Sequence, residues 1–177
     1  MVQQLQTMVG QSVDVMTNPN EITFERYERH GSLREAALYI GLAAVVAGIF
    51  SLGGGALGFV GGVLNALIGF FLFTWLVYFI GKQQGGTGTF DEVAYTFSLF
   101  IAPLTIIGGL LGIVAAIPII NLLTPLLGLA LLAVQAVFAF IAVRSSMNIS
   151  DKRTAIITLG GAVIATFIVQ LIAAMII

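Results

Sequence analysis

The sequence has few charged residues and no cysteine. Asp, Glu, Lys and Arg make up 8% of the 177 residues, whereas a typical soluble domain carries roughly 25%. Seven basic against eight acidic residues give a net charge of −1, without the basic excess that nucleic-acid binding requires. The absence of cysteine excludes disulfides, thiolate metal sites and thiol nucleophiles. A single histidine, His30, leaves no converging metal ligands. We therefore expect a membrane protein that binds no nucleic acid, metal or cofactor.

Long charge-free stretches take the place of the missing charges. They cover residues 36–81, 93–143 and 154–177. Because a helical span needs about 20 residues, they predict two, two and one membrane helices. The first stretch follows a mixed acidic and basic segment, unlike a signal peptide, so we expect the first span to be retained. The fold class is therefore all-α and polytopic, with five membrane helices.

Capping and breaking residues set the expected boundaries. Ser32 with Glu35 and Thr89 with Glu92 are spaced as capping boxes. Asn18 is the expected N-cap of a short helix that ends near His30, and Thr124-Pro125 and Ser150-Asp151 are expected to open the last two spans. After an N-terminal region at 1–31, the domain at 32–177 should hold spans at about 32–52, 56–80, 90–117, 125–143 and 151–177.

Residues 1–17 have the pattern of an amphipathic helix. Apolar residues recur at intervals of 3, 4, 4 and 3, namely Val2, Leu5, Val9, Val13 and Met16. Such a helix suits the membrane interface, although its polar face has no Lys or Arg. It equally suits a helix that packs on its own protein, and the pattern leaves both interpretations open.

The charges predict the orientation of the chain in the membrane. With five spans, all seven Lys and Arg fall on the side that holds the N-terminus, the 81–92 loop and the 144–153 loop. The positive-inside rule then predicts a cytoplasmic N-terminus and an outward C-terminus in the cell membrane. Interface-preferring aromatic residues lie near the same loops: Tyr39, Trp75, Tyr78 and Tyr95.

Small residues suggest how the helices contact one another. The candidates for close packing are Gly41, Gly48, Gly54, Gly58, Gly62, Gly108 and Gly112. Packing within the monomer is the favoured interpretation, with a homo-oligomer interface as the alternative. Pro103 lies within the third span and is expected to kink it.

The polar residues of the spans are few and uncharged: Asn65, Thr74, Ser98, Thr105, Gln135, Thr166 and Gln170. Hydrogen bonding between helices is favoured over a solute pathway for Asn65, Gln135 and Gln170, since a coupled transporter normally has an ionisable residue in its path. No nucleophile has a nearby base, so we expect no enzyme. A basic rim could contact lipid headgroups: Arg34, Lys82, Arg144, Lys152 and Arg153.

The order of these features resembles the Yip domain family (Ypt-interacting proteins), in its prokaryotic form. The matching positions are Pro19 and Phe24, the run Ser32 to Ala36, the run Gly85 to Phe90, Pro103-Leu104, and Arg144 to Thr154. The resemblance covers about residues 15–177 and implies a five-helix fold with a cytosolic N-terminus.

The resemblance also bears on partners. Eukaryotic members of the family bind Rab-type small GTPases and related membrane proteins. Here the Asp-Leu-x-Gly-Pro signature survives only as Pro19, and the Gly-Tyr pair expected before Pro103 reads Ser98-Leu99, which weakens the expectation of GTPase binding. We expect a membrane scaffold or adaptor that organises lipids or protein partners at the cytoplasmic face. The alternative is a passive channel or small-solute transporter lined by Asn65, Thr74 and Gln135.

Overall fold

The structure, a computed structural model, describes residues 2–115 and 117–176, and helices dominate these residues. The elements are α1 (Val2–Thr17), α2 (Glu21–Glu28), α3 (Leu33–Phe50), the 3-10 turn η1 (Leu52–Gly54), α4 (Gly55–Gln83), α5 (Phe90–Val114), α6 (Pro118–Asn121), α7 (Thr124–Ser146) and α8 (Lys152–Ile176). No strand occurs in the described residues.

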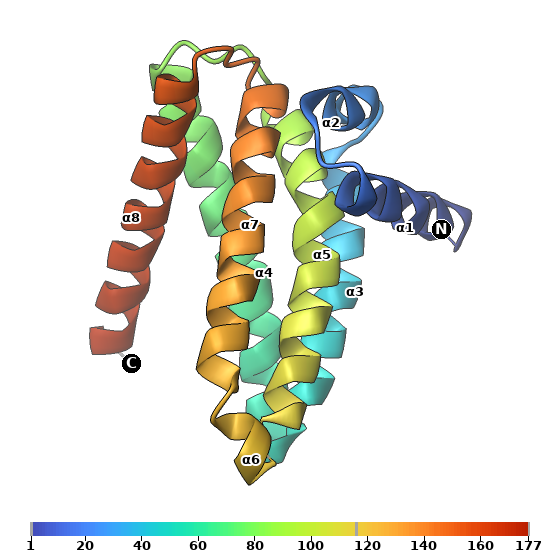
Figure 1. Cartoon of the computed structure of the whole chain (residues 1–177), viewed down its shortest axis with the longest axis vertical. Helices are drawn as coiled ribbons and strands as arrows, with labels where there is room; N and C mark the ends of the chain where they lie inside the picture. Colours follow the sequence, from blue (N-terminus) through green and yellow to red (C-terminus); the bar gives the residue numbers. More distant parts are fainter. Residues whose placement is uncertain (1, 116, 177) are drawn as a thin grey trace.

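Five helices, α3, α4, α5, α7 and α8, are long and apolar enough to span a membrane. They lie side by side along the long axis of the molecule (Figure 1). α5 packs against α3, α4 and α7, whereas α8 packs against α4 and α7 at the edge of the bundle. The predicted all-α fold with five membrane helices is thus confirmed.

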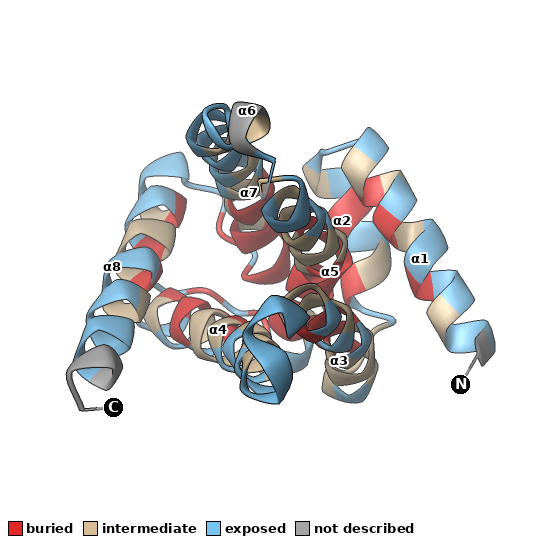
Figure 2. Ribbon diagram, turned by 90° about the horizontal axis from the view of Figure 1, so that it is seen from below, coloured by how far each residue is buried: buried red, intermediate tan, exposed pale blue. Residues whose placement is uncertain are grey.

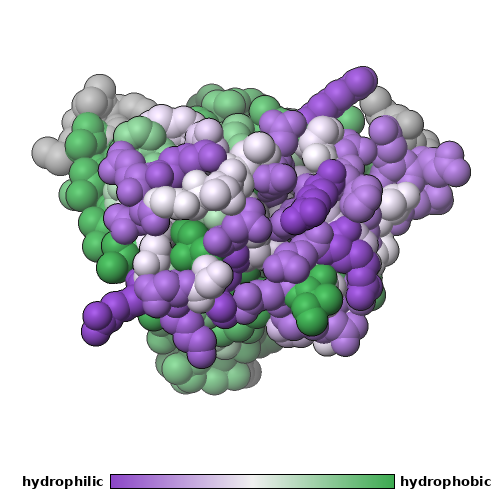
Figure 3. All heavy atoms as spheres, turned by 90° about the horizontal axis from the view of Figure 1, so that it is seen from above, coloured by the Kyte–Doolittle hydropathy of each residue, from purple (hydrophilic) through white to green (hydrophobic). Residues whose placement is uncertain are grey.

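The two ends of the bundle differ in charge. One end carries α1, α2 and the connections 84–89 and 147–151, and all the Asp, Glu, Lys and Arg residues lie there or in the adjoining helical turns. We call it the charged end. Figure 3 views this end and shows hydrophilic residues over most of its surface. The opposite, uncharged end consists of the connections 51–54 and 117–123.

Helix starts follow the predicted caps in part. Both capping boxes, Ser32 with Glu35 and Thr89 with Glu92, are confirmed. Asn18 is not the cap of α2: Asn20 is, and its side chain accepts from the Thr23 amide at 2.9 Å. Asn18 instead extends the end of α1, because its backbone amide bonds to the Asp14 carbonyl.

The last two helices start differently from each other. Thr124 does not cap α7. Its hydroxyl donates to the Ile120 carbonyl, and Leu123 is the N-cap without a side-chain bond. At α8, the Asp151 carboxylate accepts from the backbone amide and the hydroxyl of Thr154 at 2.9 and 2.7 Å, as an N-terminal cap should. These bonds hold the pKa of Asp151 below its ordinary value.

The core lies near the charged end. Phe100 is stacked on Phe138 with ring centroids 5.7 Å apart, and its ring also meets those of Phe97 and Phe24 at 5.3 and 6.3 Å. All residues from Val93 to Phe100 are buried. Figure 2, a view from the uncharged end, shows buried residues concentrated where α5 meets α3, α7 and α2.

The glycine-rich loop before α5 owes its composition to a close approach. A Cβ atom on Gly88 would lie 1.7 Å from the Ser146 carbonyl oxygen, and one on Gly86 would crowd Gly81 and Met147. The Thr87 amide donates to the Met147 carbonyl at 3.0 Å. Two connections far apart in the sequence are thereby joined at the charged end.

Candidate functional site

Helix α2 is fixed to the charged end of the bundle by three different contacts. Phe24 is fully buried and meets Phe100 edge to face. The Ser145 hydroxyl donates to the Glu28 carboxylate at 2.5 Å, and Glu21 forms an ion pair with Arg144. Contacts to α5 and α7 therefore orient this short helix, which alone would be too short to be stable.

Glu28 is an acid in an unusual setting. Its side chain is 2% exposed, and burial raises the pKa of its carboxyl above the ordinary value. The charges of Glu92 and Glu25 act in the same direction, while the Ser145 bond and Arg29 oppose it. The stability of the contact between α2 and the bundle therefore depends on whether the Glu28 carboxyl is protonated.

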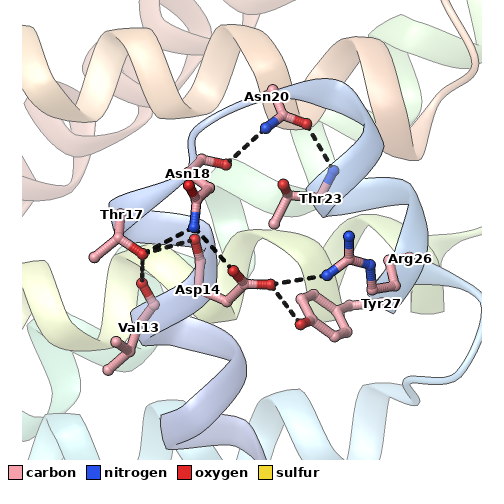
Figure 4. A network of polar contacts seen from close by, with 8 residues as sticks. All are labelled: Val13, Asp14, Thr17, Asn18, Asn20, Thr23, Arg26 and Tyr27. Atoms are coloured by element: carbon pink, nitrogen blue, oxygen red, sulfur yellow. Dashed lines mark hydrogen bonds and ion pairs between the residues drawn. The ribbon is translucent and has the colours of Figure 1, made fainter.

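A polar network joins α1 to α2 around Asp14 (Figure 4). The Asp14 carboxylate accepts from the Tyr27 hydroxyl at 2.6 Å, from the Asn18 amide at 3.1 Å and from Arg26 at 3.2 Å. The hydrogen bonds from Tyr27 and Asn18, and then the Arg26 charge, lower the pKa of Asp14. The hydrogen bond to Asp14 also raises the pKa of the Tyr27 hydroxyl. The network fixes the angle between the two helices.

Helix α1 packs on the bundle with a face that the sequence pattern did not single out. Met8, Ser12 and Val15 are its buried residues, and Ser12 bonds to the Tyr39 hydroxyl at 2.9 Å. Of the predicted apolar stripe, Val9 and Val13 are 50% and 57% exposed. α1 therefore packs on its own protein and also leaves an apolar strip uncovered beside the contact.

The outer face of α2 is charged. Ile22, Glu25 and Arg26 on α2 are exposed, and the exposed Arg29 and His30 follow them in the turn after the helix. These side chains stand on, or directly after, a helix whose opposite face is buried. We refer to them below as the α2 face.

The five predicted headgroup residues separate into two groups. Arg144 is engaged within the protein: besides Glu21, its guanidinium donates to the Ser150 carbonyl at 3.2 Å. The other four, Arg34, Lys82, Lys152 and Arg153, are exposed. Lys82 also donates to the Thr87 carbonyl at 3.1 Å. The exposed four remain candidates for lipid headgroups.

A cavity of about 690 Å³ lies within the bundle, away from all the charges. It is lined by one face of each long helix, and its wall includes the polar residues Ser51, Asn65, Thr105, Gln135, Thr166 and Gln170. Figure 2 shows α4, α5, α7 and α8 arranged around this part of the molecule. The fold thus brings together most of the uncharged polar residues of the spans.

Thr74 and Ser98 are placed elsewhere. Both are buried, and their hydroxyls donate to carbonyls of their own helices, Phe70 and Tyr95 respectively. Toward the charged end, the lining extends to Phe73, Phe100 and Leu159, beyond which lies the aromatic core. Among the described residues the cavity is therefore a recess that ends at this core.

The glycines predicted for helix packing have different surroundings. A Cβ on Gly48 would lie 2.6 Å from the Val63 side chain, and one on Gly58 would lie 2.3 Å from the Ser51 carbonyl oxygen. Gly62 packs against the Ser51 side chain. Gly108 has ordinary contact distance to Leu131, and a Cβ on Gly41, Gly54 or Gly112 would meet open space. Gly62 and Gly112 also line the cavity. Pro103 lies inside α5, which continues through it.

The described residues contain no group of three His, Cys, Asp or Glu that could hold a metal ion. Asp91 and Glu92 serve the chain itself: Glu92 completes a capping box, and Asp91 accepts from the Leu33 amide at 3.3 Å. His30 is exposed, with its ring 3.2 Å from the Arg26 carbonyl.

Sequence reasoning missed the pairs Glu28 with Ser145 and Glu21 with Arg144. They are separated by 117 and 123 residues, so no local spacing could have indicated them.

Comparison with known proteins gives one result. The sequence model of the Yip1 domain matches residues 13–174, nearly the whole chain. No curated protein and no solved structure matches significantly. Within the matched region, Phe24 is buried under α5, and the Phe90 ring meets Tyr78 edge to face at 5.7 Å.

Proposed function

The chain belongs to the Yip1 domain family of membrane-embedded proteins, and from this premise we propose that it is a non-enzymatic membrane scaffold. The α2 face is its binding surface for protein partners. The exposed basic residues Arg34, Lys82, Lys152 and Arg153 contact anionic lipid headgroups at the same end.

One observation carries the proposal: α2 is fastened to the bundle through one face and presents charge on the other. A partner that binds the α2 face meets side chains on an already ordered helix, which lowers the entropy cost of association. Exposed charges of both signs favour selective electrostatic pairing over bulk adhesion.

The proposal includes an orientation. All basic residues lie at the charged end, so the positive-inside rule favours that end in the cytoplasm, with the C-terminus of α8 outside. The exposed strip of α1 at Val9 and Val13 then lies in the headgroup layer of the cell membrane.

The test is affinity purification of the tagged, detergent-solubilised protein, with quantification of the proteins that accompany it. The variant Glu25→Lys/Arg29→Glu inverts two charges of the α2 face without touching its buried side. The matched control, Gln83→Lys/Gln84→Glu, introduces one charge of each sign at exposed positions of the same end, where α4 ends. We expect partners to be lost with the first variant and with deletion of residues 1–31, and kept with the control. Equal recovery in all variants would contradict the scaffold role.

The alternative of a channel is less well supported. Asn65 and Gln135 line one cavity, as a solute pathway would require. Thr74 does not, and the cavity ends at the aromatic core. We therefore do not propose a passage through the bundle.

A further inference from the structure

The cavity carries polar groups at a depth where water is scarce. Asn65, Thr105 and Gln135 lie nine to eleven residues from the uncharged-end termini of their helices, or about 15 Å along the axis at 1.5 Å per residue. Gln170 follows Thr166 by one turn on α8, on the same face. Four helices therefore contribute polar side chains to one cavity in the middle of the membrane.

These polar groups are largely without protein partners. Thr166 donates to the Ala162 carbonyl at 2.7 Å. Among the described residues, the side chains of Asn65, Thr105, Gln135 and Gln170 form no such bond. An amide that faces hydrocarbon without a partner is costly, and membrane helices usually bury it against another polar group. The three amides here offer donors and acceptors to whatever occupies the cavity.

The occupant must be uncharged. Of the residues that the structure describes, no Asp, Glu, Lys, Arg or His lines the cavity, so a phosphate or ammonium headgroup would lose its hydration and gain no counter-charge. The rest of the wall is apolar, with Phe50, Phe70 and Leu132 among its members. A ligand with an uncharged polar head and an apolar body fits this wall.

The cavity is also accessible from the bilayer. Every residue from Phe167 to Ile172 on α8 is exposed, including Gln170, which lines the cavity. This half of α8 therefore packs little against the rest of the protein, and Figure 2 shows it standing apart from α7. A ligand dissolved in the membrane can reach the amides beside α8.

We propose that the cavity binds an uncharged lipid with a hydroxyl or ester head, of the diacylglycerol type. The head hydrogen-bonds to Asn65, Gln135 and Gln170, and the acyl chains pass beside α8 into the bilayer. The volume of about 690 Å³ is within the usual range of ligand pockets, about 300–1,000 Å³, and accommodates the head with the first part of the chains.

The test uses the full-length protein in phosphatidylcholine vesicles with two photoactivatable probes. One is a diacylglycerol with a diazirine in an acyl chain, and the other is a phosphatidylglycerol with the same chain. We expect the diacylglycerol to label cavity-lining peptides of α4, α7 or α8. An excess of unlabelled diacylglycerol should compete, whereas unlabelled phosphatidylglycerol should not.

Two glycines of α4 provide a matched pair of variants. Gly69 lines the cavity and Gly61 does not, and a Cβ on either would meet nothing within 4 Å. Gly69→Leu should fill the cavity and lower competable labelling at least about tenfold, equivalent to about 1.4 kcal/mol. Gly61→Leu should leave it unchanged. Gly112→Leu fills the cavity from α5 and gives a second, independent reading if Gly69→Leu fails to fold.

A second pair of variants tests the hydrogen bonds to the ligand separately from the volume of the cavity. Asn65→Leu/Gln135→Leu should lower labelling about thirtyfold, equivalent to about 2 kcal/mol, because two hydrogen bonds to the ligand are lost. Asn121→Leu removes an exposed amide from α6, outside the cavity, and should have no effect.

Other occupants give other results. Equal labelling by both probes, or competable labelling that survives Gly69→Leu and Gly112→Leu, would overturn the proposal.

Since the chain has no cysteine, Asn65→Cys provides a single thiol. Its rapid modification by a charged, water-soluble reagent would indicate a hydrated cavity and exclude a resident lipid. Efficient disulfide-linked dimers of Asn65→Cys would indicate a second copy of the chain instead.

Discussion

The two halves of the bundle are built in different ways. In the half near the charged end, α5 is buried without interruption from Val93 to Phe100, and Gln11 of α1 and Glu28 of α2 accept hydrogen bonds from Tyr95 on α5 and Ser145 on α7. In the half near the uncharged end, α5 exposes Leu110 and Ile113, and α7 is exposed from Pro125 to Ala130. One half has a protein core, and the other has a cavity.

The difference follows from side-chain size. The first half is packed by phenylalanines, whereas the faces of α4 and α5 that line the cavity also carry Gly69 and Gly112, where an added Cβ would meet nothing within 4 Å. Hydrocarbon chains solvate apolar surface as well as another helix does, so a membrane protein is not driven to close such a space. The core near the charged end should therefore carry most of the stability.

The largest effect should come from the core itself. Phe100→Ala removes a ring that is 1% exposed and meets three other rings. We expect a loss of about 3–5 kcal/mol in the free energy of unfolding. Leu110→Ala, in the same helix but 48% exposed, should cost less than about 1 kcal/mol. Unfolding in mixed micelles, followed by circular dichroism, measures both. Similar losses would mean that stability is spread evenly along α5.

A second comparison concerns the connections at the two ends. Gly88→Ala would place a Cβ 1.7 Å from the Ser146 carbonyl, whereas a Cβ on Gly53 meets nothing within 4 Å. The backbone must shift in the first case, at a cost of about 1–3 kcal/mol. Gly53→Ala should stay within about 0.5 kcal/mol of the wild type. Thermal unfolding in detergent distinguishes them, and a neutral Gly88→Ala would show that the 84–89 loop can move away from α7.

The smallest effect is one of pH. Because burial raises the pKa of Glu28, the folded state binds its proton more tightly than the unfolded state. That stabilisation is complete below the unfolded pKa, near 4.5, and is lost as the pH rises through the folded pKa. Glu28→Gln keeps an acceptor for Ser145 and carries no charge. It should raise the melting temperature near neutral pH and change it little below about pH 4.

The comparison variant is Glu25→Gln on the exposed face of α2, which should change the melting temperature less than Glu28→Gln, because the Glu25 charge contributes less to the raised pKa of Glu28 than burial does. Asp14 and Asp151, whose lowered pKa values favour folding at higher pH, are common to all three proteins and cancel in the differences. If the difference in melting temperature between Glu28→Gln and the wild type does not change with pH, Glu28 has the same pKa in the folded and unfolded states.

Much of the fold could be read locally. Ser32 with Glu35 and Thr89 with Glu92 reveal helix starts because their partners are three residues away. Asn18 misled because Asn20, two residues later, is as good a cap. The α1 stripe left two interpretations open, because a single sequence period cannot say which apolar flank of a helix meets the protein.

The site was less predictable. Arg144 was predicted to contact lipid headgroups from its place in a basic loop, and its ion pair with Glu21 on α2 could not be read from any local spacing. Asn65, Gln135 and Gln170 were recognised as polar residues within spans, but their convergence depends on how four helices are rotated about their axes.

The sequence alone determined that this chain is a five-helix membrane protein with its charges at one end, because burying charge or unpaired backbone in hydrocarbon costs too much for any other arrangement. Which side chains meet across the bundle was decided by the tertiary structure. The rotation of the helices, the docking of α2 on Phe100 and the space beside the glycines of the cavity depend on contacts between residues far apart in the chain. Such contacts position the α2 face and form the cavity.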